Sequence, residues 1–209
     1  MYRSSLLLLS ILVFASAQYA QGDPIVSVTG SDDGGIVIFS GQAFAVSWSQ
    51  ESLTLDTAIS ARLSSNGRAG EEGIAFLSNA LGPGTSMDAL VASADFIFPT
   101  APSDFTLFAD LDLPAGTYYL SIIGKSPSWG SWWMSASEPI LETAPGVVLG
   151  PTFGFQTRET FLPASQVWND NTSSPNFSVT TSVPEPSVAS FILCGGLLAL
   201  RSKRRRAGV

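Results

Sequence analysis

The chain has 209 residues, a formal net charge of −7 and no histidine. Charged residues make up 13% of it, against about 25% in an average soluble protein, which argues against a disordered chain, a coiled coil and a nucleic-acid binder. The lack of histidine excludes Ser-His-Asp and Cys-His catalysis and histidine-ligated metals, and the single cysteine excludes an intramolecular disulfide and a cysteine-rich zinc site.

Residues 1–17 have the three parts of a secretory signal peptide. Arg3 supplies the positive charge, Leu6 to Phe14 form a short apolar region, and Ala15-Ser16-Ala17 has the small-x-small form that places cleavage after Ala17. An uncleaved membrane anchor is the alternative, but the apolar run is far shorter than the roughly 20 residues that a spanning helix needs. We therefore expect an exported protein.

The expected body, residues 18–168, is patterned as an all-β domain. Apolar residues alternate with other residues over 44–48, 57–63 and 105–113. Turn-forming clusters rich in Gly, Pro, Asn, Asp and Ser separate these runs from further short candidates. Those candidates are 25–29, 35–39, 73–78, 90–98, 131–136 and 146–149, and one more, 174–180, lies beyond residue 168. The pattern predicts an antiparallel β-sandwich or jelly roll.

Residues 105–123 are predicted to form a β-hairpin. The alternating run 105–113 ends at Pro114-Ala115-Gly116, and residues 117–123 follow as a run rich in aromatic and branched side chains.

The segment 18–182 is strongly acidic. It contains sixteen acidic residues and only four basic ones, Arg62, Arg68, Lys125 and Arg158. Such a surface repels nucleic acid and anionic lipid. We therefore expect no nucleic-acid partner.

Three tryptophans lie close together in the sequence, Trp129, Trp132 and Trp133. Indole rings among Gly and Ser can stack on sugar faces, so these residues are candidates for glycan binding. The alternative is that one or two of them fill the core. On a strand Trp132 and Trp133 must face opposite sides, so at most one of these two can point fully inward. Trp48, on an alternating strand, is expected in the core.

Acidic pairs occur at Asp32-Asp33 and at Asp110 and Asp112. Calcium prefers oxygen ligands, and two carboxylates could also serve a glycan-acting enzyme. A solvated strand face explains Asp110 and Asp112 equally, and a turn explains Asp32 and Asp33. We predict no metal site, no cofactor and no catalytic residue.

The C-terminal part begins with an expected polar spacer, residues 169–182, and continues as a tail, residues 183–209. The tail contains Pro184-Glu185-Pro186 and then an apolar run over 188–200. Those 13 residues span about 20 Å as a helix, shorter than a bilayer core. A basic cluster follows, Arg201, Lys203, Arg204, Arg205 and Arg206. Under the positive-inside bias this cluster stays in the cytoplasm.

The ordered triad of Pro184-Glu185-Pro186, helix 188–200 and basic end resembles the PEP-CTERM sorting tail of exported bacterial proteins. The resemblance implies recognition by an exosortase, which carries the catalytic residues itself. It also implies a Gram-negative envelope, export across the inner membrane, a membrane anchor before processing, and an association with exopolysaccharide. The stretch 113–120, with Trp132 and Trp133, is similar to β-rich bodies found upstream of such tails, which implies a β-sandwich and no activity.

We therefore expect a non-enzymatic envelope or extracellular-matrix protein whose body is a structural or interaction module. The first alternative is a carbohydrate-binding module acting on exopolysaccharide through Trp129, Trp132 or Trp133. The second is a glycan-acting enzyme that uses Asp110 and Asp112.

Overall fold

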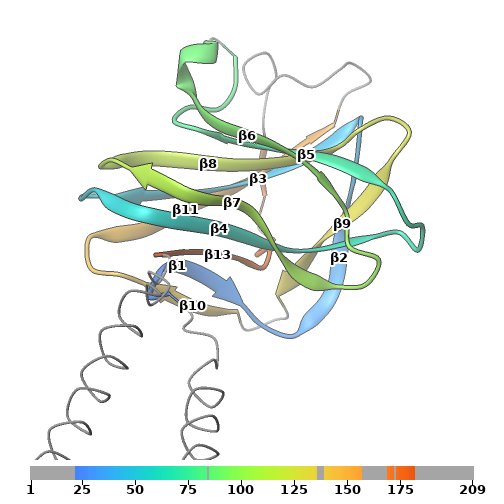
Figure 1. The fold of residues 1–209 in the computed structure, drawn as a ribbon, viewed down its shortest axis with the longest axis horizontal. Coiled ribbons are helices and arrows are strands. Elements are labelled where there is room, and N and C mark those ends of the chain that lie inside the picture. The colour runs from blue at the N-terminus through green and yellow to red at the C-terminus, as the bar shows by residue number, and fades with distance from the viewer. Residues whose placement is uncertain (1–21, 84, 136–138, 157–168, 172, 182–209) are drawn as a thin grey trace, which may run out of the picture. The chain divides into compact units, whose positions relative to one another are not determined.

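The computed structural model describes residues 22–83, 85–135, 139–156, 169–171 and 173–181 (Figure 1). They belong to one compact unit, Gln21–Ser182, which has its own hydrophobic core and so can fold by itself. The predicted signal peptide and the predicted sorting tail lie outside the described residues. Within the described ranges, no helix has the length and apolar character needed to cross a membrane.

The described residues form strands and one short 3-10 helix, η1 (Met87–Ala89), and every strand pairing is antiparallel. The prediction of an all-β, antiparallel sandwich is confirmed. The strands are β1 (Pro24–Thr29), β2 (Asp32–Phe39), β3 (Gln42–Gln50), β4 (Thr54–Ser65), β5 (Glu72–Ser78), β6 (Leu90–Ile97), β7 (Ser103–Leu113), β8 (Gly116–Gly124), β9 (Trp129–Ser135), β10 (Ile140–Thr143), β11 (Val147–Gln156), β12 (Asn169–Asn171) and β13 (Phe177–Thr181).

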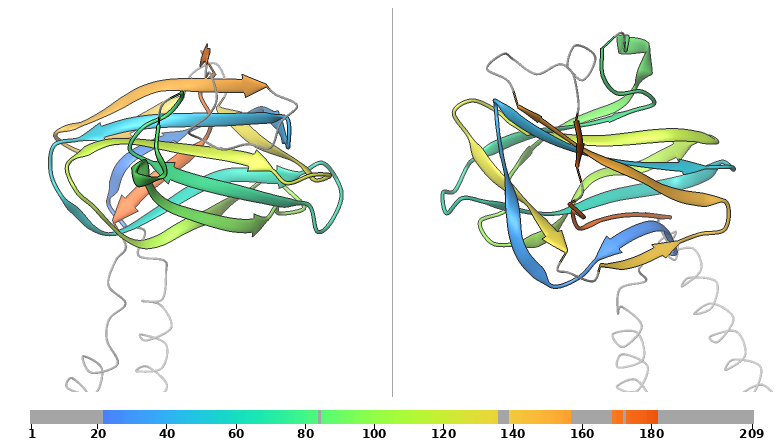
Figure 2. Two further views of the ribbon diagram at one scale, coloured as in Figure 1. Left: turned by 90° about the horizontal axis from the view of Figure 1, so that it is seen from above. Right: turned by 180° about the vertical axis from the view of Figure 1, so that it is seen from behind.

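The strands form two layers (Figures 1 and 2). One layer has the order β6-β5-β8-β3-β11-β12, and the other has the order β10-β1-β13-β4-β7. Strands β2 and β9 pair with each other and connect the layers, because β9 also pairs with the end of β4 and β2 turns directly into β3. Figure 1 shows β2 and β9 running steeply across the ends of the other strands.

The core lies between the layers. Trp48 of β3 stacks on Tyr118 of β8 at 5.5 Å and reaches Phe177 of the opposite layer at 6.3 Å. Phe96 of β6 likewise packs on Phe105 of β7, with ring centroids 5.7 Å apart. Each such apolar side chain contributes about 1.5–3 kcal/mol when fully buried. The expectation that Trp48 belongs to the core is confirmed, since it is fully buried.

The predicted hairpin over 105–123 is wrong. β7 pairs with β4, whereas β8 pairs with β3 and β5, so the two consecutive strands lie in different layers. Both strands contribute apolar residues to the core, Leu107 and Leu113 from β7 and Tyr118 and Leu120 from β8. The connection is held by side chains: Gln50 Nε2 donates to the Leu113 carbonyl at 2.8 Å, and Tyr118 Oη donates to the Pro114 carbonyl at 2.7 Å.

Three register shifts interrupt the pairing of β4 and β7, and two of them lie near Asp56 and Asp110. The register slips by one residue on each strand around Asp56 and Asp110, and both residues have positive φ, 48° and 55°. Asp tolerates this left-handed conformation better than most residues, which accounts for aspartate at both bulges.

The body extends past residue 168. β13, within the expected spacer 169–182, lies between β1 and β4 and contributes Phe177 and Val179 to the core. Of the polar residues that suggested a spacer, Ser178, Thr180 and Thr181 belong to β13 and Asn169–Asn171 forms β12. β10 and β12 were not expected from the sequence, and β10 is exposed along its whole length.

Candidate functional site

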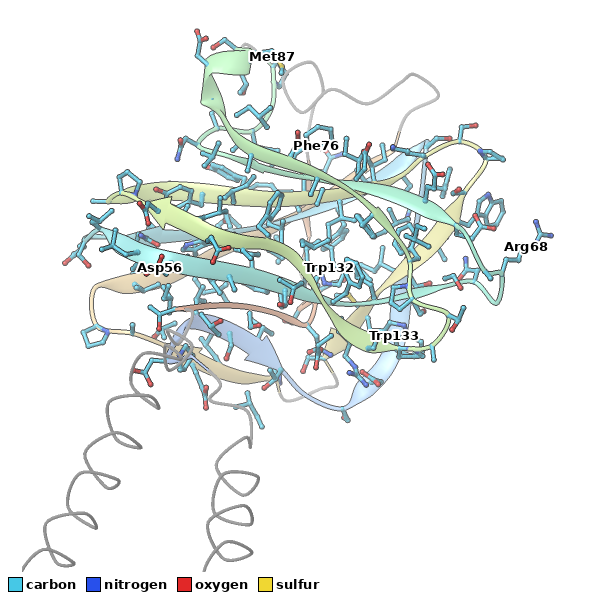
Figure 3. All side chains as sticks on the ribbon, viewed as in Figure 1. Asp56, Arg68, Phe76, Met87, Trp132 and Trp133 are labelled. Atoms are coloured by element: carbon cyan, nitrogen blue, oxygen red, sulfur yellow. The ribbon has the colours of Figure 1, made fainter. Side chains whose placement is uncertain are left out.

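β9 separates the three candidate tryptophans. Trp132 is fully buried, donates from Nε1 to the Asn176 carbonyl at 2.9 Å, and meets Phe44 edge to face at 6.2 Å. Trp133 points to the other side of the strand, is half-buried, and donates from Nε1 to Ser64 Oγ at 2.7 Å (Figure 3). Trp129 is 55% exposed. Of the three, Trp129 alone offers a largely free indole to a ligand.

The position of Trp129 is fixed at the start of β9. Its backbone N–H donates to Glu71 Oε2 at 2.7 Å. Its ring lies 5.9 Å from that of Phe39, which pairs with it across β2 and β9. The backbone bond therefore fixes the point from which the indole projects, and Phe39 contacts the indole on one side.

A cavity of about 400 Å³ lies beside this indole and is lined by Asn66, Arg68, Glu71 and Trp129. The first three come from the turn between β4 and β5, where Gly67 and Gly70 adopt positive φ of 83° and 81°. Those glycines let the chain reverse tightly and bring its polar side chains up to the start of β9. Asn66 is anchored there, because its Oδ1 accepts from Ser131 Oγ at 3.0 Å.

The cavity contains a basic side chain, Arg68, that is not ion-paired, unlike the other basic residues of the described ranges. Arg62 forms a two-point ion pair with Asp32, which raises the pKa of Arg62 and lowers that of Asp32. Lys125 hydrogen-bonds Asp95, which raises its pKa. Within the described ranges Arg68 forms no ion pair. The cavity therefore combines a free guanidinium, a carboxylate, an amide and an indole.

The acidic pairs lie elsewhere. Asp110 and Asp112 are both exposed, and Asp112 Oδ1 accepts a hydrogen bond from the backbone N–H of Asp56 at 3.3 Å. Asp32 is committed to Arg62. In the part of the chain that the structure describes, no group of three or more His, Cys, Asp or Glu side chains could hold a metal ion.

The sequence did not single out Asn66, Arg68 or Glu71 as site residues. Its signal for them was the turn at Ser65-Asn66-Gly67, which places polar residues at a reversal but does not show which strand end they meet. The sorting-motif residues Pro184 to Pro186 and the basic cluster fall outside the described residues.

Comparisons with known proteins found no matching family profile and no matching curated protein. Similar solved structures include a family 35 carbohydrate-binding module from an environmental isolate, at 16% identity and a TM-score of 0.35, covering 64% of this chain and 94% of that one. A second is Xyl-CBM35 in complex with a glucuronic acid containing disaccharide, at 13% identity and a TM-score of 0.37, with the same coverage.

A third similar structure is a family two carbohydrate esterase from Cellvibrio japonicus, at 14% identity and a TM-score of 0.32. The match covers 70% of this chain but only 34% of the esterase, so this chain spans about a third of that protein.

Proposed function

We propose that the β-sandwich is a carbohydrate-binding body, which binds a polysaccharide at Trp129 and the adjoining cavity of Asn66, Arg68 and Glu71. We further propose that the protein is exported and sorted by an exosortase through residues 183–209. In this account the chain is a non-enzymatic component of the cell envelope or extracellular matrix. The exposed, anchored indole beside a polar cavity is the observation that carries the proposal.

The chemistry of the cavity fits a sugar. The apolar C–H face of a pyranose ring can cover the indole, while its hydroxyl groups need donors and acceptors at the rim. Arg68 supplies donors, Glu71 supplies acceptors, and the Asn66 side chain carries both types of group. The backbone hydrogen bond from Trp129 to Glu71 ties the stacking surface to one of these polar groups. One ligand can therefore contact the indole of Trp129 and the carboxylate of Glu71 at the same time.

The sorting proposal is supported by the sequence pattern. The Pro184-Glu185-Pro186 triplet disfavours a helix and favours an extended backbone, which is the conformation that peptidases generally bind. Deleting the exosortase of the host should leave a species of higher mass in the membrane fraction. An unchanged mass would contradict the sorting proposal without affecting the binding proposal.

Co-sedimentation of unit 21–182 with exopolysaccharide from the native host tests the binding proposal. Truncation of a central stacking residue costs about 2 kcal/mol or more, so Trp129→Ala should weaken binding by about 30-fold. Val148→Ala removes another exposed apolar side chain, on β11, and should leave binding unchanged. Equal binding by the parent and Trp129→Ala, or no binding by the folded parent, would refute the proposal.

A further inference from the structure

A second recess, which we call the β13 groove, lies on the face of the β10-β1-β13-β4-β7 layer that points away from the core. It has a volume of about 680 Å³, and its lining includes Ser27, Ser60, Thr106, Glu142 and Ser178. Ser27, Ser60, Thr106 and Ser178 alternate along their strands with apolar residues of the core, which places them on the opposite face of the sheet, and Glu142 pairs with Ser27 on the exposed strand β10.

The register aligns these five residues in one row. Glu142 pairs with Ser27, Ser27 with Ser178, Ser178 with Ser60, and Ser60 with Thr106. Neighbouring strands lie about 4.8 Å apart, so the row extends for about 19 Å across the layer. Short hydroxyl side chains line the middle of this row. Because these side chains are short, a ligand can approach the sheet closely and form hydrogen bonds with several residues of the row.

The end of the groove contains a buried amide that has no partner. Asn176 is 3% exposed, and neither its Oδ1 nor its Nδ2 forms a hydrogen bond. Its backbone is fully engaged: its N–H donates to the Trp133 carbonyl, and its carbonyl accepts from the Arg62 N–H and from Trp132 Nε1. Alternation with Phe177 places the Asn176 side chain on the groove face, beside Ser178.

An unsatisfied buried amide is costly, and native structures hold few of them. Asn176 therefore points to a partner from outside the chain that offers both a donor and an acceptor. A hydroxyl group does both.

The charge of the groove further restricts the chemical class of ligand that can bind. Asp23, Asp104 and Glu142 are among its lining residues, and none of the described residues that line it is basic. Asp104 already forms an ion pair with Arg62, at 3.6 Å, whereas Asp23 and Glu142 form no ion pair within the described ranges. Anionic chains such as polyuronates are repelled by such a lining, whereas protonated amines are attracted.

We propose that the β13 groove binds a polyhydroxylated chain that carries free amino groups, that is, a polysaccharide containing unacetylated amino sugars. Sugar hydroxyls pair with the Ser and Thr row and with Asn176, and the ammonium groups lie near Glu142 and Asp23. This site is separate from the Trp129 cavity, with which it shares no lining residue. The proposal does not depend on that cavity binding a glycan.

Calorimetric titration of unit 21–182 with glucosamine oligomers at pH 6 tests the proposal. N-acetylglucosamine oligomers and galacturonate oligomers of equal length are the comparison ligands. We expect glucosamine oligomers to bind at least tenfold more tightly than the acetylated ones, and galacturonate oligomers not to bind. Equal affinity for the amine and acetylated forms, or preference for galacturonate, would overturn the ligand class.

Asn176→Leu should weaken glucosamine-oligomer binding at least tenfold while leaving the melting temperature equal or higher, because the amide has no protein partner to lose. If Asn176→Leu does not fold, Ser178→Val and Glu142→Gln replace it as groove variants. Ser178 is half-buried and Glu142 is exposed, so both variants should fold, and each should weaken glucosamine-oligomer binding. Trp129→Ala is the matched control and should bind normally. Unchanged affinity in the folded groove variants would overturn the site, and a loss confined to Trp129→Ala would assign the binding to the other cavity.

Discussion

The burial difference between Trp132 and Trp129 gives a sharp test of the fold. Trp132 has no exposed surface, and its truncation to Ala removes its contact with Phe44 and its hydrogen bond to the Asn176 carbonyl. Large-to-small changes of buried Trp cost about 3–5 kcal/mol. For a unit of this size each kcal/mol shifts the melting temperature by about 2–4 °C, so Trp132→Ala should lower it by about 6–20 °C.

Trp129→Ala should behave differently. The Trp129 ring is 55% exposed, and its bond to Glu71 uses the backbone N–H, which survives the substitution. Surface changes of this kind stay within about 0.5 kcal/mol, so its melting temperature should fall by no more than about 2 °C. Thermal unfolding of unit 21–182, followed by far-UV circular dichroism, compares the two variants. Equal losses, or a larger loss for Trp129→Ala, would refute this placement of β9.

Three further predictions concern stability. The pKa of Asp32 in the folded protein lies below its usual 3.8, so its ion pair with Arg62 stabilises the protein above that pH. This stabilisation is lost as the pH falls through the folded pKa, so Asp32→Asn should lower the urea midpoint at pH 7 but not at pH 2. An equal effect at both pH values would contradict the ion pair. Gly130→Ala should destabilise by about 1–3 kcal/mol in the same assay, because its Cβ would lie 2.2 Å from Phe98 Cε1, and a neutral result would contradict that packing. Asp110→Gly should be neutral or stabilising while Asp110→Val costs about 1–2 kcal/mol, because φ is 55°; a Val variant as stable as the Gly variant would argue against the bulge.

Strand identity was partly readable from the sequence, because strands such as β4 and β5 alternate between buried and more exposed residues. The large apolar residues Phe44, Val46 and Trp48 of β3 belong to the core as predicted, and the small residues between them are buried as well. The sequence did not predict β10. It is exposed along its whole length, so no apolar alternation marks it.

Strand pairing was not readable in the same way. The run around Pro114 has the pattern of a hairpin, yet the chain crosses there from one layer to the other. Local sequence reports only which face of a strand is apolar, and both strands face one core in either arrangement. The bonds from Gln50 and Tyr118 that hold the crossing come from side chains whose partners depend on the assembled sandwich.

The candidate site was readable only in part. Tryptophan chemistry drew attention to Trp129, Trp132 and Trp133, and strand alternation separated Trp132 from Trp133. The neighbours of Trp129 come from the turn between β4 and β5, distant in sequence, so their convergence depends on tertiary structure. Asn176 gave no signal, because an unpartnered amide can be recognised only once its surroundings are known.

Protection of Trp129 from oxidation tests the central claim most directly. Unit 21–182 would be treated with N-bromosuccinimide with and without saturating exopolysaccharide from the native host, and oxidation at each tryptophan would be read by peptide mass spectrometry. Trp129 should oxidise faster than Trp133 and Trp132 in the free protein, and polysaccharide should slow it several-fold while leaving Trp133 unchanged. Equal oxidation of Trp129 with and without polysaccharide would contradict the claim that its indole is the binding surface.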